Sequence, residues 1–469
     1  MASGVLGTAV SGLMAFQRSL ETTAHNISNA NTEGYSRQSV TSSARLAQFT
    51  GAGYVGQGVD VTNIGRSYNQ FLTSQLRSST SAFGEVNQYK SLTGQIDTFV
   101  ADPASGLSPV MKDFFSAMNK VANDPSSIAA RQEALAASDN MAQRFNTMNS
   151  RLQDANTQVA SDLTSMTEKV NNYAASIADL NSKITLDMGR SPGGQQPNDL
   201  LDQRDLLLSK LSELVDVSVV PQNNGTTSVF IGKGQPLVLD NTSNSLVITG
   251  STTDPKKLDI SLKTPGTTQV ITDQIAGGSL AGTLRFRDEV LAPAQQNLSN
   301  IAETMTAEVN KLHATGFDLD GGTGNDLLAY NATSGKLSVN LTDPRKLAAA
   351  STAATLPGDN RNALALANLE NSSVAILQNG VATTTTATFQ DAYGQIVSKI
   401  GTQAQSANIS AAAQESLLNN AKSASENLSG VNLDEEAANL IKYQQSYQAA
   451  AQMISAAKGM FDSLLGAVR

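Results

Sequence analysis

The segment VNLDEEAANLIKYQQSYQAAAQMISAAKGMFDSLL, residues 431–465, repeats an apolar or aromatic side chain every seven residues. A spacing of seven places such side chains on one face of an α-helix. Asn432 or Asp434 can cap this helix, and the acidic residues 434–436 suit its positive N-terminal end. The sequence therefore predicts a long amphipathic helix whose apolar row is Leu433, Leu440, Tyr447, Ile454 and Phe461.

The N-terminal segment has the same seven-residue repeat, and its row is Leu6, Leu13, Leu20 and Ile27. We expect the two terminal helices to pair as a coiled coil. Their seams are rich in alanine, and an isolated pair of such helices would be marginally stable in water. We therefore predict that the two rows form an assembly interface between copies of the chain.

Helical periodicity also dominates the middle of the chain, in the segments 126–188, 198–214, 281–314 and 386–428. Residues 126–188 contain neither proline nor glycine. If this helix is continuous, it spans roughly 90 Å at about 1.5 Å per residue. These stripes are expected to close an ordinary helical bundle within one chain.

Between residues 215 and 280 the period changes to two, which is typical of β-strands. The dipeptide Asn224-Gly225 marks a hairpin turn in this insert. Residues 315–358 favour one further strand at KLSVNL and a short helix after Pro344. We expect β structure in two pieces at most.

These patterns predict a fold that is mainly α with a β insert. A terminal helical coiled coil would comprise residues 1–64 and 429–469. An elongated helical-bundle domain would comprise residues 65–212 and 282–428, and residues 213–281 would form a small projecting β domain.

Composition excludes several classes of partner. The formal net charge is -9, and the lysines and arginines are scattered, so neither nucleic acid nor a membrane is an expected partner. No apolar run reaches the roughly 18 residues of a membrane span. The first positive side chain is Arg18, so we expect no cleavable secretory signal. The chain has no cysteine, hence no disulfide and no thiolate metal ligand.

Catalytic and ligand-binding residues are not evident. The two histidines, His25 and His313, lie in different helical segments and are interpreted as ordinary helix residues. The loop DLDGGTGND, residues 318–326, fails the EF-hand template because Thr323 and Ala329 stand where glycine and glutamate are needed. QIAGG, residues 274–278, lacks the spacing of a phosphate-binding loop. We therefore predict no enzyme activity, no cofactor and no metal.

Four stretches resemble one family of axial flagellar proteins. They are NISNANTEGYSRQ at 26–38, PNDLLDQRDLLLSKLSELVDVSVV at 197–220, GTLRFRDEVLAPAQQNL at 282–298, and the C-terminal stretch from Ser429 to Leu465. Together they resemble the FlgK family of hook-associated proteins, the first of the two hook-filament junction proteins.

The resemblance implies a structural protein of the bacterial flagellum. It implies secretion through the flagellar type III pathway, an extracellular location at the hook-filament junction, and self-association in a ring at the hook tip. The implied partners are hook protein, the second junction protein, and a cytoplasmic export chaperone at the C-terminal region. It also implies that the terminal helices line the inner tube of the axial structure.

The turn after the first helix is interpreted through the same resemblance. Asn31, Thr32, Gly34 and Tyr35 are expected to end the inner helix and redirect the chain. Glycine would supply an unusual backbone conformation and the tyrosine an anchoring ring. Many family members have proline where this chain has Glu33.

Two alternatives stay open at this point. The chain could be a filament-type protein similar to flagellin, or the second junction protein. It could also be an exported ligand-binding module that uses its β insert, although Phe230 is the one aromatic residue between 215 and 280.

Overall fold

The computed structural model describes residues 2–49, 51, 53–102, 106–190, 195–251 and 257–468. Two compact units divide the chain. Unit 1 comprises residues 1–84, 166–278 and 413–469, and unit 2 comprises residues 85–165 and 279–412. The expected β domain, residues 213–281, falls almost entirely in unit 1, together with the terminal helices. The two units do not test the division into three domains that the sequence predicts, and that division stays a prediction.

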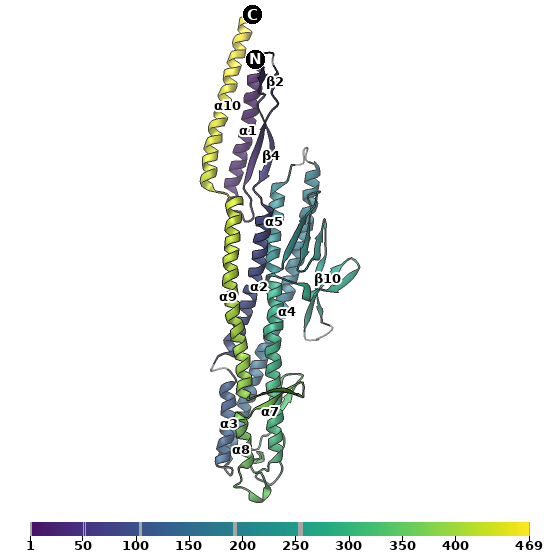
Figure 1. The fold of residues 1–469 in the computed structure, drawn as a ribbon, viewed down its shortest axis with the longest axis vertical. Coiled ribbons are helices and arrows are strands. Elements are labelled where there is room, and N and C mark those ends of the chain that lie inside the picture. Colours follow the sequence, from purple (N-terminus) through teal and green to yellow (C-terminus); the bar gives the residue numbers. More distant parts are fainter. Residues whose placement is uncertain are drawn as a thin grey trace. The chain divides into compact units, whose positions relative to one another are not determined.

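The terminal helices of unit 1 are α1 (Ala2–Ser28) and α10 (Leu433–Val468). They pack along each other and run antiparallel, with both chain ends at the same end of the pair (Figure 1). The expected pairing of the chain ends is therefore confirmed.

The remaining helices of unit 1 include α5 (Asn198–Leu214) and parts of α2 (Gln70–Val100), α4 (Ile128–Arg190) and α9 (Phe389–Ser429). The helix α4 is continuous over 63 residues, because no proline or glycine interrupts residues 128–188. The helix α5 begins directly after Pro197 and carries Asp199 in its first turn.

The β insert is confirmed as two antiparallel sheets in unit 1. The first has the order β5 (Val217–Pro221), β6 (Thr227–Ile231), β7 (Gln235–Leu239) and β8 (Thr242–Ser243). The second has the order β11 (Thr267–Val270), β10 (Leu258–Thr264) and β9 (Ser245–Gly250). A 3-10 turn, η1 (Thr272–Gln274), follows. Gly225 has φ +84°, as the predicted hairpin turn requires.

The expectation of two β pieces at most was wrong. In unit 1, β1 (Gln38–Ala44) pairs with β4 (Val59–Arg66), and β2 (Gln48–Phe49) pairs with β3 (Tyr54–Val55). Serine and threonine dominate β1, so its sequence has little of the apolar alternation that marks a strand. This hairpin packs on α1, and that contact is not evident from the sequence of the hairpin alone.

Unit 2 contains α3 (Ser108–Asn123), α8 (Arg361–Asn368) and a continuous helical run made of α6 (Gly278–Phe286), the π-helical turn η2 (Arg287–Leu291) and α7 (Ala292–Thr315). Parts of α2, α4 and α9 complete its helices. Two hairpins follow α7, namely β12 (Leu328–Asn331) with β13 (Lys336–Val339), and β14 (Val374–Gln378) with β15 (Val381–Ala387). Short 3-10 turns are η3 (Pro344–Lys346), η4 (Ala353–Thr355) and η5 (Leu369–Asn371).

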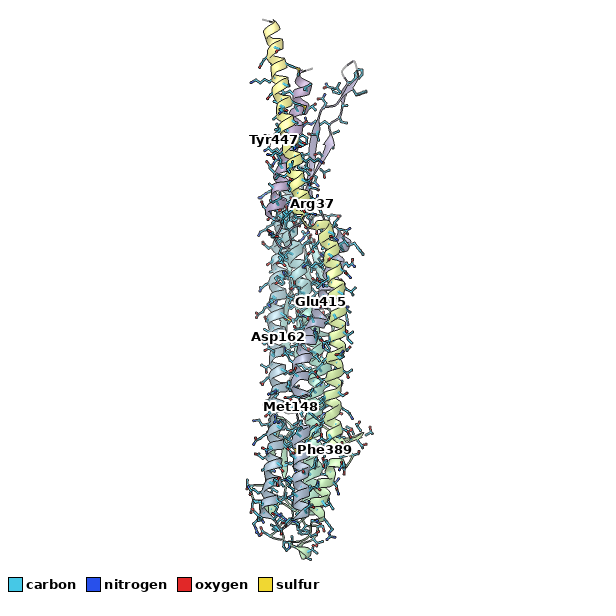
Figure 2. All side chains as sticks on the ribbon, turned by 90° about the vertical axis from the view of Figure 1, so that its left-hand side faces the viewer. Arg37, Met148, Asp162, Phe389, Glu415 and Tyr447 are labelled. Atoms are coloured by element: carbon cyan, nitrogen blue, oxygen red, sulfur yellow. The ribbon has the colours of Figure 1, made fainter. Side chains whose placement is uncertain are left out.

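Large apolar side chains form the core of unit 2. Phe114, Phe115 and Phe389 are fully buried, and Phe115 lies 6.2 Å from Phe389 in a stacked arrangement. Met111 and Met118 are also fully buried. Figure 2 shows Phe389 where α9 begins. This unit therefore closes a conventional hydrophobic core, as the predicted helical bundle requires.

Five helix asparagines attach strands to helices by one repeated contact. In each, the side-chain amide donates to the carbonyl of a strand residue and its oxygen accepts from the N–H of that same residue. Donor and acceptor of the amide thus replace a neighbouring strand. We call these contacts asparagine clamps; they are Asn26 on Gln38, Asn146 on Leu337, Asn171 on Leu246, Asn181 on Thr227, and Asn310 on Leu328.

Mainly helical architecture with small β-sheets is thus confirmed. Within the described ranges, none of the helices combines the length and the apolar character needed to cross a membrane.

Candidate functional site: the terminal helix pair and its polar joint

Small and polar side chains occupy the buried positions of α1 and α10, which pack on each other and, for α1, on the β1–β4 hairpin. The buried positions of α1 are Ala9, Ser11, Ala15, Ser19, Thr22, Thr23 and Asn26, and those of α10 are Glu436, Ala450 and Ala457. Side chains of this size bury little apolar area and let the helix backbones come close together. The pair therefore has a thin interface within one chain.

The predicted apolar rows lie beside this contact and are not fully covered by it. Leu6, Leu433 and Phe461 keep 41%, 52% and 53% of their surface exposed. The other members are half-buried: Leu13, Leu20, Ile27, Leu440, Tyr447 and Ile454. Figure 2 shows Tyr447 on α10, beside α1. The structure thus brings the two rows to one helix pair and leaves part of each row accessible.

Further exposed apolar side chains on the same pair escaped the sequence reasoning. They are Val5, Met14, Ile441, Met453 and Met460. The heptad count had selected one row on each helix, whereas the exposed apolar surface is wider than one row. Because these side chains lie outside the two predicted rows, the exposed apolar side chains of the pair are not confined to one row.

The turn after α1 has the predicted glycine conformation. Gly34 has φ +80°, and a β-carbon added there would lie 2.9 Å from Cβ of Leu206 on α5. Asn31 and Thr32 are exposed, and the Thr32 hydroxyl donates to Oδ1 of Asn29 over 3.2 Å. Glycine is therefore required here both by the backbone conformation and by the close approach of α5.

Tyr35 anchors the turn to the end of α1. Its hydroxyl donates to Oδ1 of Asn26 over 2.7 Å and lies 3.0 Å from Nδ1 of His25. Burial raises the pKa of the Tyr35 hydroxyl, and the carboxylates of Asp199, Asp202 and Glu436 raise it further. The hydroxyl therefore stays protonated and keeps its hydrogen bond.

Arg37 ties the N-terminal segment to the turn between α9 and α10 (Figure 2). Its backbone N–H donates to the carbonyl of Ser429 over 2.8 Å. Its guanidinium contacts Glu435 at 3.0 Å and Glu436 at 3.1 Å, and the Glu436 side chain is only 2% exposed. A buried carboxylate needs such a partner, because an unpaired buried charge is costly.

The helix α5 meets the same segment through its aspartates. The backbone N–H of Ser36 donates to Oδ2 of Asp202, and the Gln38 side chain donates to Oδ1 of Asp199, both over 2.9 Å. Arg66 on β4 pairs with Asp202 at 2.9 Å and with Asp205 at 2.6 Å. Burial raises the pKa of the Asp202 carboxyl, while the Ser36 N–H and Arg66 act in the opposite direction.

Three distant sequence motifs therefore meet at one place in unit 1. We call this cluster the polar joint; its residues are Asn26, Tyr35, Arg37, Gln38, Arg66, Asp199, Asp202, Asp205, Glu435 and Glu436. All three motifs are recognisable in the sequence, but the sequence alone does not show which of their charged residues form pairs. The feature of the sequence that could have predicted the polar joint is the presence of opposite charges in separate motifs.

The remaining sequence candidates form no catalytic or metal site. His313 is fully buried, and its Nε2 accepts from the N–H of Ala348 over 2.8 Å. Asp318 accepts from the N–H groups of Asp320 and Gly322 and pairs with Lys346 at 3.1 Å, so its carboxylate closes its own loop. Across the part of the chain that the structure describes, no cluster of three or more His, Asp or Glu residues could hold a metal.

Family models match three parts of the chain. The model described as "Flagellar hook-associated protein FlgK helical domain" matches residues 93–328, about half of the chain. "Flagellar basal body rod FlgEFG protein C-terminal" matches residues 423–467, and "Flagella basal body rod protein" matches residues 6–35. The two rod models thus fall on the terminal helices.

Full-length relatives carry the same family name. "Flagellar hook-associated protein 1" of Escherichia coli is 29% identical, with 99% of each chain covered. The protein of that name in Bacillus subtilis is 28% identical, with 98% of this chain and 97% of the relative covered. A solved structure, "the flagellar hook junction protein FlgK from Burkholderia pseudomallei", aligns with TM-score 0.68 at 22% identity. It covers 76% of this chain and all of that one, which supports the fold.

Proposed function

Because the chain belongs to the FlgK family of flagellar hook-associated proteins, we propose that it is the adaptor that joins the flagellar hook to the filament. Family membership makes it a structural component of the bacterial flagellum. The junction role rests on the printed name of the Burkholderia structure, which concerns that protein. In this role the chain leaves the cell through the flagellar type III pathway.

The observation that carries the proposal is the incomplete burial of the terminal pair. Nine row residues remain exposed or half-buried in one copy of the chain. They are Leu6, Leu13, Leu20, Ile27, Leu433, Leu440, Tyr447, Ile454 and Phe461. Copies of the chain arranged in a ring would cover these rows, and the hydrophobic gain would come from contacts between subunits. Hook protein and the second junction protein would contact the two faces of that ring.

An export chaperone would cover the same surface before secretion. A partly exposed apolar helix such as α10 is an aggregation hazard in the cell. A cytoplasmic chaperone at the C-terminal region would remove that hazard and would dissociate when the chain is exported.

The direct test is a strain that lacks the gene. We expect it to build hooks and to release its flagellin into the medium, measured by electron microscopy and by flagellin in the culture supernatant. Filaments that remain attached to hooks would contradict the junction role.

The assembly surface is tested by complementing that strain with Leu440→Asp. A carboxylate buried between subunits costs several kcal/mol, so secretion should continue while filament attachment fails. Gln445→Asp adds the same charge at an exposed polar position on another face of α10, and it should restore filaments. If both variants restore filaments, Leu440 does not lie in an interface between subunits.

A further inference from the structure

The helical run from Gly278 to Thr315 contains one π-helical turn, η2. At this turn the N–H of Ala292 donates to the carbonyl of Arg287, five residues back. An α-helix would use the carbonyl four residues back. The run therefore holds one extra residue at this point.

Pro293 explains where this turn lies. In an α-helix the N–H of residue 293 would donate to the carbonyl of Glu289, but proline has no N–H and its ring collides with that carbonyl. The wider π turn moves the carbonyl away from the ring. The Glu289 carbonyl is thereby left without its usual α-helical donor.

Gln403 on α9 supplies a donor in place of the missing N–H. Its Nε2 donates to the Glu289 carbonyl over 3.2 Å. The other end of the same amide, Oε1, is buried without a hydrogen-bond partner. A buried acceptor without a partner is unfavourable. The contact that favours this position of the Gln403 side chain is therefore the hydrogen bond that its Nε2 donates.

The side chain of Glu289 ties the same turn to α2. Its Oε2 accepts from Nε of Arg285 over 3.0 Å and from the Tyr89 hydroxyl over 3.3 Å. The Arg285 guanidinium also lies over the Tyr89 ring, 4.4 Å from its centroid. One residue of the π turn is thus bound from α2, α6 and α9.

We propose that η2 is the place at which this helical run opens most easily and that one hydrogen bond keeps it closed. Pro293 prevents the turn from forming regular α-helix, and Gln403 holds the turn closed by donating to the carbonyl of Glu289. We call this hydrogen bond the latch. When the latch is released, the helix opens at this turn before it opens elsewhere in α7. This proposal concerns unit 2 alone and does not depend on the junction role.

The test measures hydrogen exchange of the purified full-length chain by mass spectrometry. Gln403→Leu removes the donor, and peptides covering residues 289–298 should exchange about fivefold faster, the effect of one hydrogen bond. Gln405→Leu changes an exposed glutamine on the same helix and should leave these peptides unchanged. Peptides covering residues 300–311 of α7 should be unchanged in both variants.

The Pro293→Ala background makes the test specific for the latch. Residue 293 then has an N–H that can reach the Glu289 carbonyl, so Gln403→Leu should lose its effect in that background. An equal effect in both backgrounds, or none in the wild-type background, would overturn the proposal. If Pro293→Ala fails to fold, Gln403→Glu replaces it: a carboxylate facing the carbonyl should speed exchange more than leucine does, and exchange no faster than in the leucine variant would also overturn it.

Discussion

The terminal helix pair of unit 1 and the core of unit 2 bury different kinds of side chain. The pair buries alanine, serine and threonine and leaves methionine, leucine and phenylalanine partly in water. The core of unit 2 buries phenylalanine and methionine completely. Hydrophobic stabilisation follows the apolar area removed from water, so unit 2 can close on itself, whereas the pair gains much less within one chain.

The polar joint compensates for part of that difference. It fixes the base of the pair with ion pairs and backbone hydrogen bonds, which depend on geometry more than on area. The chain thus separates two tasks. Apolar burial holds unit 2 together, and directional polar contacts hold a helix pair whose apolar side chains stay partly exposed within one chain.

The largest expected effect comes from truncating the core of unit 2. Phe115→Ala removes a fully buried ring that meets Phe114 at 5.0 Å and Phe389 at 6.2 Å. It should lower the free energy of unfolding of unit 2 by about 3–5 kcal/mol, measured by thermal and denaturant melts. Ile409→Ala, at a side chain of unit 2 that is 63% exposed, is the control and should change little. Equal losses in the two variants would contradict the assignment of the core.

A smaller effect, confined to unit 1, is expected from Arg37→Ala. The change leaves the buried Glu436 carboxylate without its guanidinium and should weaken the attachment of α10 by about 2 kcal/mol. Limited proteolysis should cleave α10 faster, while the melting of unit 2 stays unchanged. Arg18→Ala breaks an exposed pair with Glu21 and should leave the rate unaltered. Unchanged cleavage of the Arg37 variant would show that the joint does not hold the pair.

Gly34→Ala tests the turn itself. The added methyl group meets Leu206 in a left-handed conformation, so unit 1 should lose about 1–2 kcal/mol. The matched change Gly459→Ala lies inside α10 with open space around it and should add about 0.5–1 kcal/mol. Opposite shifts of the unit 1 transition would support the assignment, and shifts of the same sign would not.

The smallest effect concerns pH and unit 2. Burial lowers the pKa of His313, Arg131 acts in the same direction, and Asp318 and Asp326 oppose it. The folded pKa therefore lies below the unfolded value of 6.5. The contribution of neutral His313 to the stability of unit 2 is fully present above pH 6.5. It is lost as the pH falls through the folded pKa, because protonated Nε2 cannot accept from the N–H of Ala348.

Denaturant melts of unit 2 at pH 7.5 and pH 5.5, chosen on either side of the ordinary histidine pKa, would show this loss. His313→Gln has no titratable ring and should show a smaller difference between the two pH values. An identical difference in the variant would exclude His313 as the cause.

The helices could be predicted where helical periodicity continues without proline or glycine. Residues 126–188 lack every helix breaker, and the structure runs one helix through them. The hairpin of β1 and β4 could not be predicted, because β1 is dominated by serine and threonine and the hairpin packs on α1, which is a tertiary contact. The π turn had an available signal, since Pro293 stands inside a helical pattern.

The site was predictable in its location and less so in its contacts. Heptad counting found the two terminal helices and their apolar rows. It did not find that alanine, serine and threonine are the buried positions of α1, because the way a helix packs on its neighbours is a tertiary property. The ion pairs of the polar joint join residues such as Arg37 and Glu435, which are 398 positions apart. The assembly interface stays a prediction for the experiments above.

The asparagine clamps also bear on how this chain can change over evolutionary time. Each amide binds the backbone N–H and C=O of one strand residue and makes no demand on that residue's side chain. Replacements at the clamped residues keep this contact as long as the new residue has a backbone N–H and fits the buried position, because Leu246, Leu328, Leu337 and Thr227 are at most 2% exposed. The asparagine on the helix therefore fixes the position of the strand, and the choice of the strand residue is limited by core packing and not by this contact.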